Sequence, residues 1–172
     1  ALACEAAGAD GITAHLREDR RHIQDHDVDR LAASVKTVFN LEMACTEEML
    51  AIAERLRPFQ VTFVPERREE VTTEGGLDVT HDPAALEKAM ARMRSAGIRS
   101  SLFIDPDSTM VKASRVLGAD AIELHTGSYA HHPNDAVHLG ALARAAALAH
   151  SLGLHVHAGH GLTVRNVTAV AA

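Results

Sequence analysis

Groups that could move protons and bind phosphate are concentrated in residues 15–22, which read HLREDRRH. His15 titrates near neutral pH and could exchange protons, while the guanidinium of Arg17 could grip a phosphate through paired N–H donors. The two residues are spaced two apart, so on a β-strand their side chains point to the same face. A solvated, salt-bridged loop is the alternative interpretation. We favour a functional site because His15 and Arg17 share a strand face.

Two glutamates in otherwise apolar segments are candidate acid–base groups. Glu42 lies in NLEMA, and Glu123 lies in IELHTG together with His125. Burial penalises a charged carboxylate and so raises its pKa towards the range that suits a general base. A structural ion pair is the alternative for each glutamate. We favour a functional role for Glu42 and Glu123 and a structural role for His125.

Two glycine-containing segments could bind anions. Gly159, His160 and Gly161 follow an apolar run, and the glycines would let a ligand approach the backbone closely. The N-terminus of a helix expected after them is a further anion site. The sequence TTEGG at residues 72–76 lies in a long segment without helix or strand periodicity, and its amides and hydroxyls could hold a phosphate. A plain surface loop explains this second segment equally well.

The histidines near the C-terminal end also suggest zinc. His155 and His157 form a His-x-His pair on one strand face, with His160 three residues further on. This spacing occurs in zinc sites. No nearby carboxylate or cysteine completes the ligand set in the sequence, so we do not predict a metal.

Alternating strands and helices must position all of these groups. The strands expected are Gly11–Leu16, Val38–Ala44, Gln60–Pro65, Arg99–Asp105, Ala121–His125 and Leu154–Ala158. The helices expected between them are Asp27–Thr37, Thr46–Arg57, Pro83–Ala96, Ser108–Leu117 and Asp135–Leu152. This alternation predicts parallel strands joined by right-handed crossovers. Thr46 and Ser108 are the residue types that cap helix N-termini.

The polarity of the strands discriminates between two α/β folds. A doubly wound sheet, covered by helices on both sides, is expected to be apolar on both faces. Here one face is repeatedly polar, as in Asn40 and Glu42 or Glu123 and His125, and the polarity gathers at strand ends. That pattern predicts a TIM (β/α)8 barrel with its site at the carboxyl ends of the strands. A complete barrel has eight strands and about 250 residues, so residues 1–172 are predicted to form a single partial TIM-barrel domain.

Composition excludes several classes of protein. The 172 residues are 47% hydrophobic and 23% charged, which is typical of a folded globular chain and not of a disordered one. No tract approaches the roughly 18 apolar residues of a membrane span. The net charge of −6 argues against nucleic-acid binding. Small phosphorylated partners remain compatible, because they need only a few local cations.

Six stretches together resemble the pyridoxine 5′-phosphate synthase family of the bacterial vitamin B6 pathway. They are AGADGITAHLREDRRHI, NLEMACTEEMLAIA, VPERREEVTTEGGLDV, SLFID, IELHTG and SLGLHVHAGHGLTVRNV. The resemblance implies a cytoplasmic TIM-barrel transferase that assembles as a homo-octamer. It implies condensation of 1-deoxy-D-xylulose 5-phosphate with 3-amino-2-oxopropyl phosphate, giving pyridoxine 5′-phosphate, phosphate and water. No organic cofactor and no metal are expected.

The same resemblance implies roles for four catalytic residues. His15 and Glu42 are implied as proton acceptors and His160 as the proton donor. Glu123 is implied to stabilise the transition state. These are groups that the residue types and strand faces had already indicated.

Four more residues are implied to bind substrate. Arg17, His22 and Thr72 match contacts to 1-deoxy-D-xylulose 5-phosphate. Gly161 matches a contact to 3-amino-2-oxopropyl phosphate. Multi-step acid–base chemistry on two phosphorylated molecules requires both proton carriers and anion anchors.

The sequence also departs from the family pattern. The first strand, with its Asn-x-Asp-His motif, and the last strand and helix have no counterpart, so the chain corresponds to strands two to seven. We expect the isolated chain to be inactive. A non-catalytic barrel fragment, or another phosphate-handling barrel enzyme, are the alternatives. A Schiff-base aldolase is disfavoured because Lys36, Lys88 and Lys112 all fall in predicted helical segments.

Overall fold

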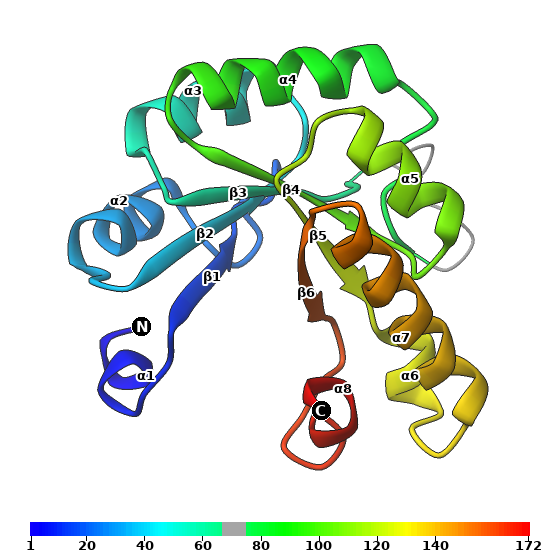
Figure 1. Ribbon diagram of the computed structural model, residues 1–172. Helices are drawn as coiled ribbons and strands as arrows, with labels where there is room; N and C mark the ends of the chain where they lie inside the picture. The colour runs from blue at the N-terminus through cyan, green and yellow to red at the C-terminus, as the bar shows by residue number, and fades with distance from the viewer. Residues whose placement is uncertain (67–74) are drawn as a thin grey trace.

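Strands and helices alternate along the chain in the computed structural model, which describes residues 1–66 and 75–172 (Figure 1). The strands are β1 (Gly11–His15), β2 (Val38–Met43), β3 (Gln60–Phe63), β4 (Arg99–Ile104), β5 (Ala121–His125) and β6 (His155–Gly159). The longer helices are α2 (Asp25–Ser34), α3 (Glu47–Leu56), α4 (Pro83–Ser95), α5 (Ser108–Val116) and α7 (Ala136–Ser151). Short helices occupy α1 (Leu2–Ala6), α6 (Gly127–His131) and α8 (Thr168–Ala171).

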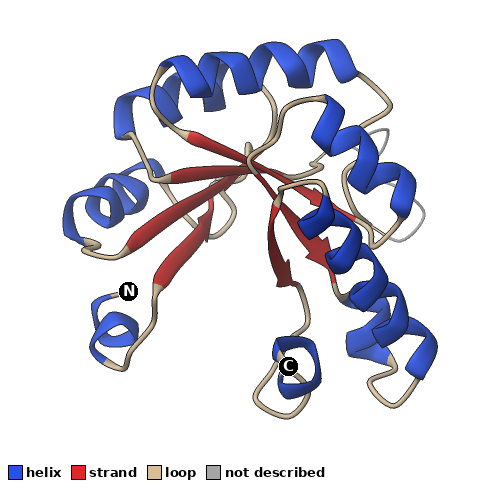
Figure 2. Cartoon of the chain, in the orientation of Figure 1, coloured by secondary structure: helices blue, strands red, loops and turns tan. Residues whose placement is uncertain are grey.

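The six strands form one sheet in the order β1-β2-β3-β4-β5-β6, and every neighbouring pair is parallel. The sheet curls, with its helices on the outer side (Figure 2). Within the described residues β1 and β6 do not pair, so the curl stays open. This is the predicted partial TIM barrel: parallel strands, helical crossovers and an inner face enclosed by the curvature.

The outer face of the sheet builds the hydrophobic core. Side chains that point outward from the central strands are buried against the helices, with 0–1% of their surface exposed: Leu41, Met43, Val61, Phe63, Leu102, Ile104, Ile122 and Leu124. Their neighbours in the sequence point inward and are mostly polar. On the inner face the Asn40 amide oxygen accepts hydrogen bonds from the Thr62 hydroxyl at 2.9 Å and the Gln60 amide at 3.3 Å. The apolar and polar residues therefore alternate along each strand because one face packs against the helices and the other lines the interior of the curl.

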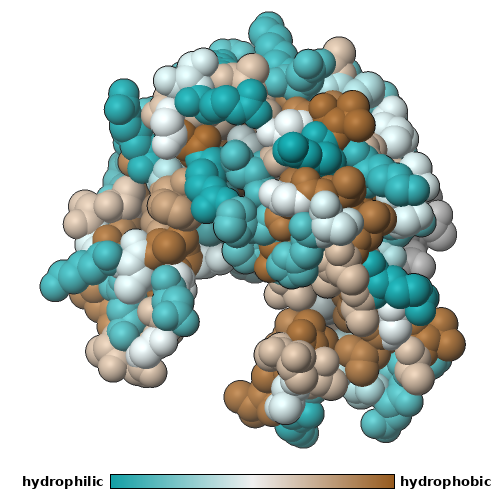
Figure 3. All heavy atoms as spheres, in the orientation of Figure 1, coloured by the Kyte–Doolittle hydropathy of each residue, from teal (hydrophilic) through white to brown (hydrophobic). Residues whose placement is uncertain are grey.

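The two ends of the sheet are less covered than its middle. β1 and β6 contain mostly exposed or partly exposed residues, whereas all four residues of β3 are buried. Figure 3 shows the molecule hollowed between two arms, one carrying β1 and the other carrying β6 and α8. The inner surface is thus accessible from this side.

The longest helix, α7, packs against the carboxyl half of the sheet. Asp135 caps its N-terminus by accepting the Val137 amide N–H at 2.8 Å. Its buried residues Leu142, Ala145 and Ala149 face β5 and β6. In the described parts of the chain, no helix combines the length and apolar character needed to cross a membrane.

Most predicted elements are confirmed to within two residues at each end, with a few corrections. Thr46 caps α3 as predicted, but α5 is capped by Asp107 and not by Ser108, which is its first helical residue. The Asp107 carboxylate accepts the amide N–H groups of Thr109 and Met110. The five-residue helix α6 was not predicted, because so short a helix has no apolar periodicity to reveal it.

Candidate active site

Five predicted functional residues line one cavity at the carboxyl ends of the strands. The cavity measures about 420 Å³ and is bounded by His15, Arg17, Glu42, Val64, Pro65, Gly75, Phe103, Glu123 and His160. Their strands lie apart in sequence, and the parallel sheet brings their ends together. Of the predicted catalytic residues, all four are present in this lining. The geometry therefore assembles the acid–base groups that the sequence indicated separately.

His15 and Glu42 face each other across two neighbouring strands. They are partners in the register of β1 and β2, and His15 Nδ1 lies 3.9 Å from Glu42 Oε2. Burial raises the pKa of Glu42, while the positive charge on His15 acts against that rise. The pair can pass protons to and from a molecule in the cavity.

Glu123 projects from β5 into the same interior. Burial, and after it the negative charge of Glu42, raise the pKa of Glu123 to about 7. Its carboxylate fits because residue 159 on β6 is glycine: a Cβ there would lie 2.2 Å from Glu123 Oε1. A carboxyl group that titrates near neutrality can give up and regain a proton under working conditions.

His160 follows β6 in an unusual backbone conformation. Its φ angle is +84°, in the left-handed region that few side chains adopt. The Thr126 hydroxyl lies 2.6 Å from the carbonyl oxygens of both Gly159 and His160, and its single proton is shared between these two acceptors. Partial burial lowers the pKa of His160, and the charges of His125 and His131 lower it further. Strain held in place by neighbouring contacts is typical of functional positions.

Glu66 belongs to this cluster and was not predicted. Its Oε1 lies 2.9 Å from His15 Nε2, and its Oε2 accepts the backbone N–H of Glu18 at 2.9 Å. Only 4% of the Glu66 side chain is exposed. The signal that could have found it is an acidic residue three positions after the end of β3, at the same edge as His15.

Replacement of Glu66 by Gln is expected to lower turnover about ten-fold in the full-length protein. An amide keeps one acceptor oxygen for the Glu18 N–H, but it places no negative charge beside His15 and so no longer favours the protonated imidazole. Steady-state kinetics and the chemical shifts of His15 check this. Glu47→Gln, on the exposed side of α3, is the control. Unchanged kcat and unchanged His15 signals in Glu66→Gln would contradict the expectation.

Of the four predicted substrate-binding residues, one lines the cavity, two do not, and one lies outside the described residues. Arg17 lines the cavity, where its Nε and one terminal nitrogen donate to the Asp19 carboxylate at 3.0 and 3.2 Å. These bonds raise the pKa of Arg17. His22 is exposed, and neither His22 nor Gly161 is among the residues that bound the cavity. Thr72 lies outside the described residues.

Comparison with known proteins identifies the family of this chain. The family described as Pyridoxal phosphate biosynthesis protein PdxJ matches residues 1–172. The chain belongs to the PdxJ family. A pyridoxine 5′-phosphate synthase of Synechococcus sp. (strain CC9605) is 55% identical to this PdxJ chain, over 100% of the chain and 70% of the relative. One from Synechocystis sp. (strain ATCC 27184 / PCC 6803 / Kazusa) is 57% identical, over 99% and 72%.

The PdxJ chain thus spans about 70% of the length of these relatives. A solved D-psicose 3-epimerase, crystallised in the presence of D-fructose, superposes with a TM-score of 0.54 at 14% identity. The match covers 90% of the PdxJ chain and 64% of the epimerase. At this identity the likeness extends to the fold alone.

The histidines that suggested a zinc site lie on β6 and directly after it. In the described part of the PdxJ chain, no group of three or more His, Cys, Asp or Glu residues is arranged to hold a metal ion. His155 and His157 are exposed on β6. His160 lies beyond the strand, where its ring contacts His125.

Proposed function

We propose that the full-length protein condenses 1-deoxy-D-xylulose 5-phosphate with 3-amino-2-oxopropyl phosphate to give pyridoxine 5′-phosphate, phosphate and water. The observation that carries this proposal is the meeting of His15, Glu42, Glu123 and His160 in one cavity of a PdxJ-family barrel. The relatives' names supply the product class. The side chains supply the acid–base groups that such a condensation needs.

The proposed reaction makes a C–N bond and a C–C bond. The amine of 3-amino-2-oxopropyl phosphate adds to the ketone of the partner, and loss of water leaves an imine. Proton removal from carbon, by His15 or Glu42, then permits loss of phosphate and ring closure, and a second molecule of water leaves as the ring becomes aromatic. His160 would donate the protons that leaving oxygens require. Glu123 would stabilise the charge that develops between these steps.

Arg17 is proposed as the phosphate anchor. A guanidinium binds phosphate through paired N–H groups, and Arg17 is the arginine among the described residues that bound the cavity. Its bonds to Asp19 hold the guanidinium at the rim of the site. A substrate phosphate would use the remaining N–H donors or displace Asp19.

The test is an assay of the full-length protein with both substrates, following pyridoxine 5′-phosphate and released phosphate. Both products are expected in equal amounts, and neither when one substrate is omitted. Arg17→Ala is expected to raise KM about ten-fold or more, whereas Arg30→Ala on the exposed face of α2 should leave it unchanged. The 172 residues alone are expected to give no turnover. Absence of product from the full-length protein would overturn the proposal and favour a non-catalytic role.

The competing Schiff-base aldolase is not supported by the described structure. Lys88 and Lys112 lie in α4 and α5, outside the sheet, and Lys36 follows the end of α2. None of the three bounds the cavity. An imine between the substrates, and not with a lysine, fits this site better.

A further inference from the structure

Two aromatic rings, those of His125 and Phe103, lie beside the imidazole of His160, the proposed proton donor. The ring centroids of His125 and His160 are 4.8 Å apart and tilted by 60°. Phe103 meets His125 edge-on at 5.1 Å and lies 6.3 Å from His160. One side of the His160 ring is therefore in contact with protein, although the residue as a whole is exposed.

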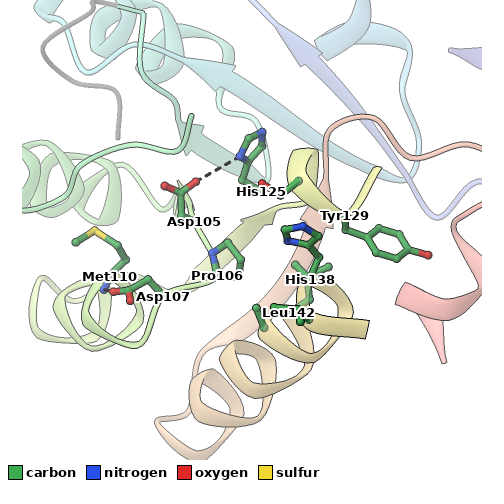
Figure 4. Close-up of a pocket in the computed structure, with 11 residues that line it drawn as sticks. Asp105, Pro106, Asp107, Met110, His125, Tyr129, His138 and Leu142 are labelled. Atoms are coloured by element: carbon green, nitrogen blue, oxygen red, sulfur yellow. Dashed lines mark hydrogen bonds and ion pairs between the residues drawn. The ribbon is translucent and has the colours of Figure 1, made fainter. Parts of the chain in front are cut away.

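His125 is itself held on several sides. Only 8% of it is exposed, and its Nδ1 lies 3.3 Å from Asp105 Oδ1. Figure 4 shows this carboxylate and imidazole pointing toward each other from the ends of β4 and β5. A Cβ on residue 127 would lie 2.7 Å from His125 Nε2, so glycine is needed there for the ring to fit. The His125 ring has little freedom to turn.

The Asp105 carboxylate is also fixed. Its Oδ1 accepts the backbone N–H of Gly76 at 3.0 Å, and only 10% of the side chain is exposed. Asp105 directly follows β4, one of the two middle strands, which also carries Phe103. The Gly76 N–H and the surrounding protein hold the Asp105 carboxylate in place. The carboxylate in turn orients His125, as carboxylates do for histidines in many active sites.

The backbone of His160 is clamped independently by Thr126, through the two carbonyl contacts at 2.6 Å. With the backbone fixed, the two side-chain torsions decide where the imidazole nitrogens lie. The His125 ring occupies the space on one side and so limits these torsions.

We propose that His125, held by Asp105, is a positioning residue that sets the orientation of the His160 imidazole toward the cavity. This inference rests on the proposed function, in which His160 is the proton donor. His125 and Asp105 also line a second cavity of about 450 Å³. His160 does not line this second cavity, and neither His125 nor Asp105 is among the residues that bound the first one.

His125→Asn in the full-length protein is expected to lower kcat about ten-fold or more while KM changes less than about two-fold, because displacement of a reacting group costs rate more than binding. Asp105→Asn keeps an oxygen for the Gly76 N–H and removes the charge beside His125, so a smaller loss of kcat is expected. His138→Gln, on the wall of the second cavity, is the matched control and should behave as the parent protein.

Dependence on His160 is the decisive readout. In a His160→Gln background, His125→Asn is expected to cause no additional loss of kcat, because the effect acts through the missing ring. An NMR titration of His160 gives a second readout that needs no turnover. His125→Asn should raise the pKa of His160 towards its ordinary value, and His138→Gln should not.

An unchanged kcat together with an unchanged His160 titration in both His125→Asn and Asp105→Asn would overturn the inference. Additive losses of kcat in the His160→Gln background would overturn it too, since they indicate a general structural effect. If the parent protein forms no pyridoxine 5′-phosphate, the proposed function fails. The NMR titration then still shows whether His125 acts on the His160 imidazole, because that measurement needs no turnover.

Discussion

Glu123→Gln is expected to remove most turnover and to stabilise the fold above neutral pH. Turnover should fall about 100-fold, because an amide carries no charge and exchanges no proton. Stability should rise because the folded structure holds Glu123 in a place that disfavours its charged form. Burial is the main cause, and the negative charge of Glu42 adds to it.

The pH dependence has a definite sign. The pKa of Glu123 is about 7 in the folded chain, against 4.5 for an unperturbed glutamate. Between these values the folded state binds the proton that the unfolded state has released, so the free energy of unfolding falls as pH rises from about 4.5 to about 7. A shift of this size corresponds to about 3 kcal/mol. Glu123→Gln removes this loss, so the variant is more stable than the parent above pH 7 and gains nothing below about pH 4.5.

Urea unfolding of the full-length protein at about pH 5 and about pH 8.5 measures the difference. Glu87→Gln, on the exposed side of α4, is the control and should leave the pH dependence of stability unchanged. If the free energy of unfolding of Glu123→Gln and of the parent changed equally with pH, the fold would not disfavour the charged form of Glu123.

His160→Gly is expected to remove turnover without weakening the fold. Loss of the imidazole should lower kcat by about 100-fold to 10,000-fold, the usual contribution of a positioned acid or base. The φ angle of +84° strains any residue with a Cβ, and glycine adopts it freely. The free energy of unfolding should therefore be unchanged or higher by up to about 1 kcal/mol.

Arg57→Gly separates the relief of backbone strain from the loss of a catalytic imidazole. Arg57 ends α3 with a φ of +50° and is exposed, away from the cavity. It should show a similar gain in stability with full turnover. A loss of stability in His160→Gly, measured beside that control, would mean that the imidazole contributes packing energy greater than the strain of its backbone.

The strands and the polar inner face were predictable because their signal is local. Side chains on a strand alternate with a period of two, so Asn40 and Glu42 had to share a face opposite Leu41 and Met43. The ends of parallel strands meet at one edge, so polar groups on different strands were expected near one another. The family resemblance then implied His15, Glu42, Glu123 and His160 as one catalytic set. The partial barrel followed from the count of strands.

Glu66 and Asp105 were not predictable in the same way. Each acts through a partner that is close only after the chain has folded: Glu66 is 51 residues from His15, and Asp105 is 20 residues from His125. His125 was assigned a structural role, and its contact with His160 connects that role to the candidate site. The cap of α5 could not be predicted from residue types either. Asp107 and Ser108 are both good capping residues, and the local backbone geometry decides which of them caps the helix.

The sequence by itself determined the order of strands and helices, the face that each strand turns inward and the types of group available for proton transfer. These follow from periodicity and side-chain chemistry, which are properties of short segments. Only the tertiary structure decided which carboxylate supports which histidine, because that depends on distances across strand ends. The raised pKa of Glu123 is likewise tertiary, since its causes are burial and the charge of Glu42 on another strand.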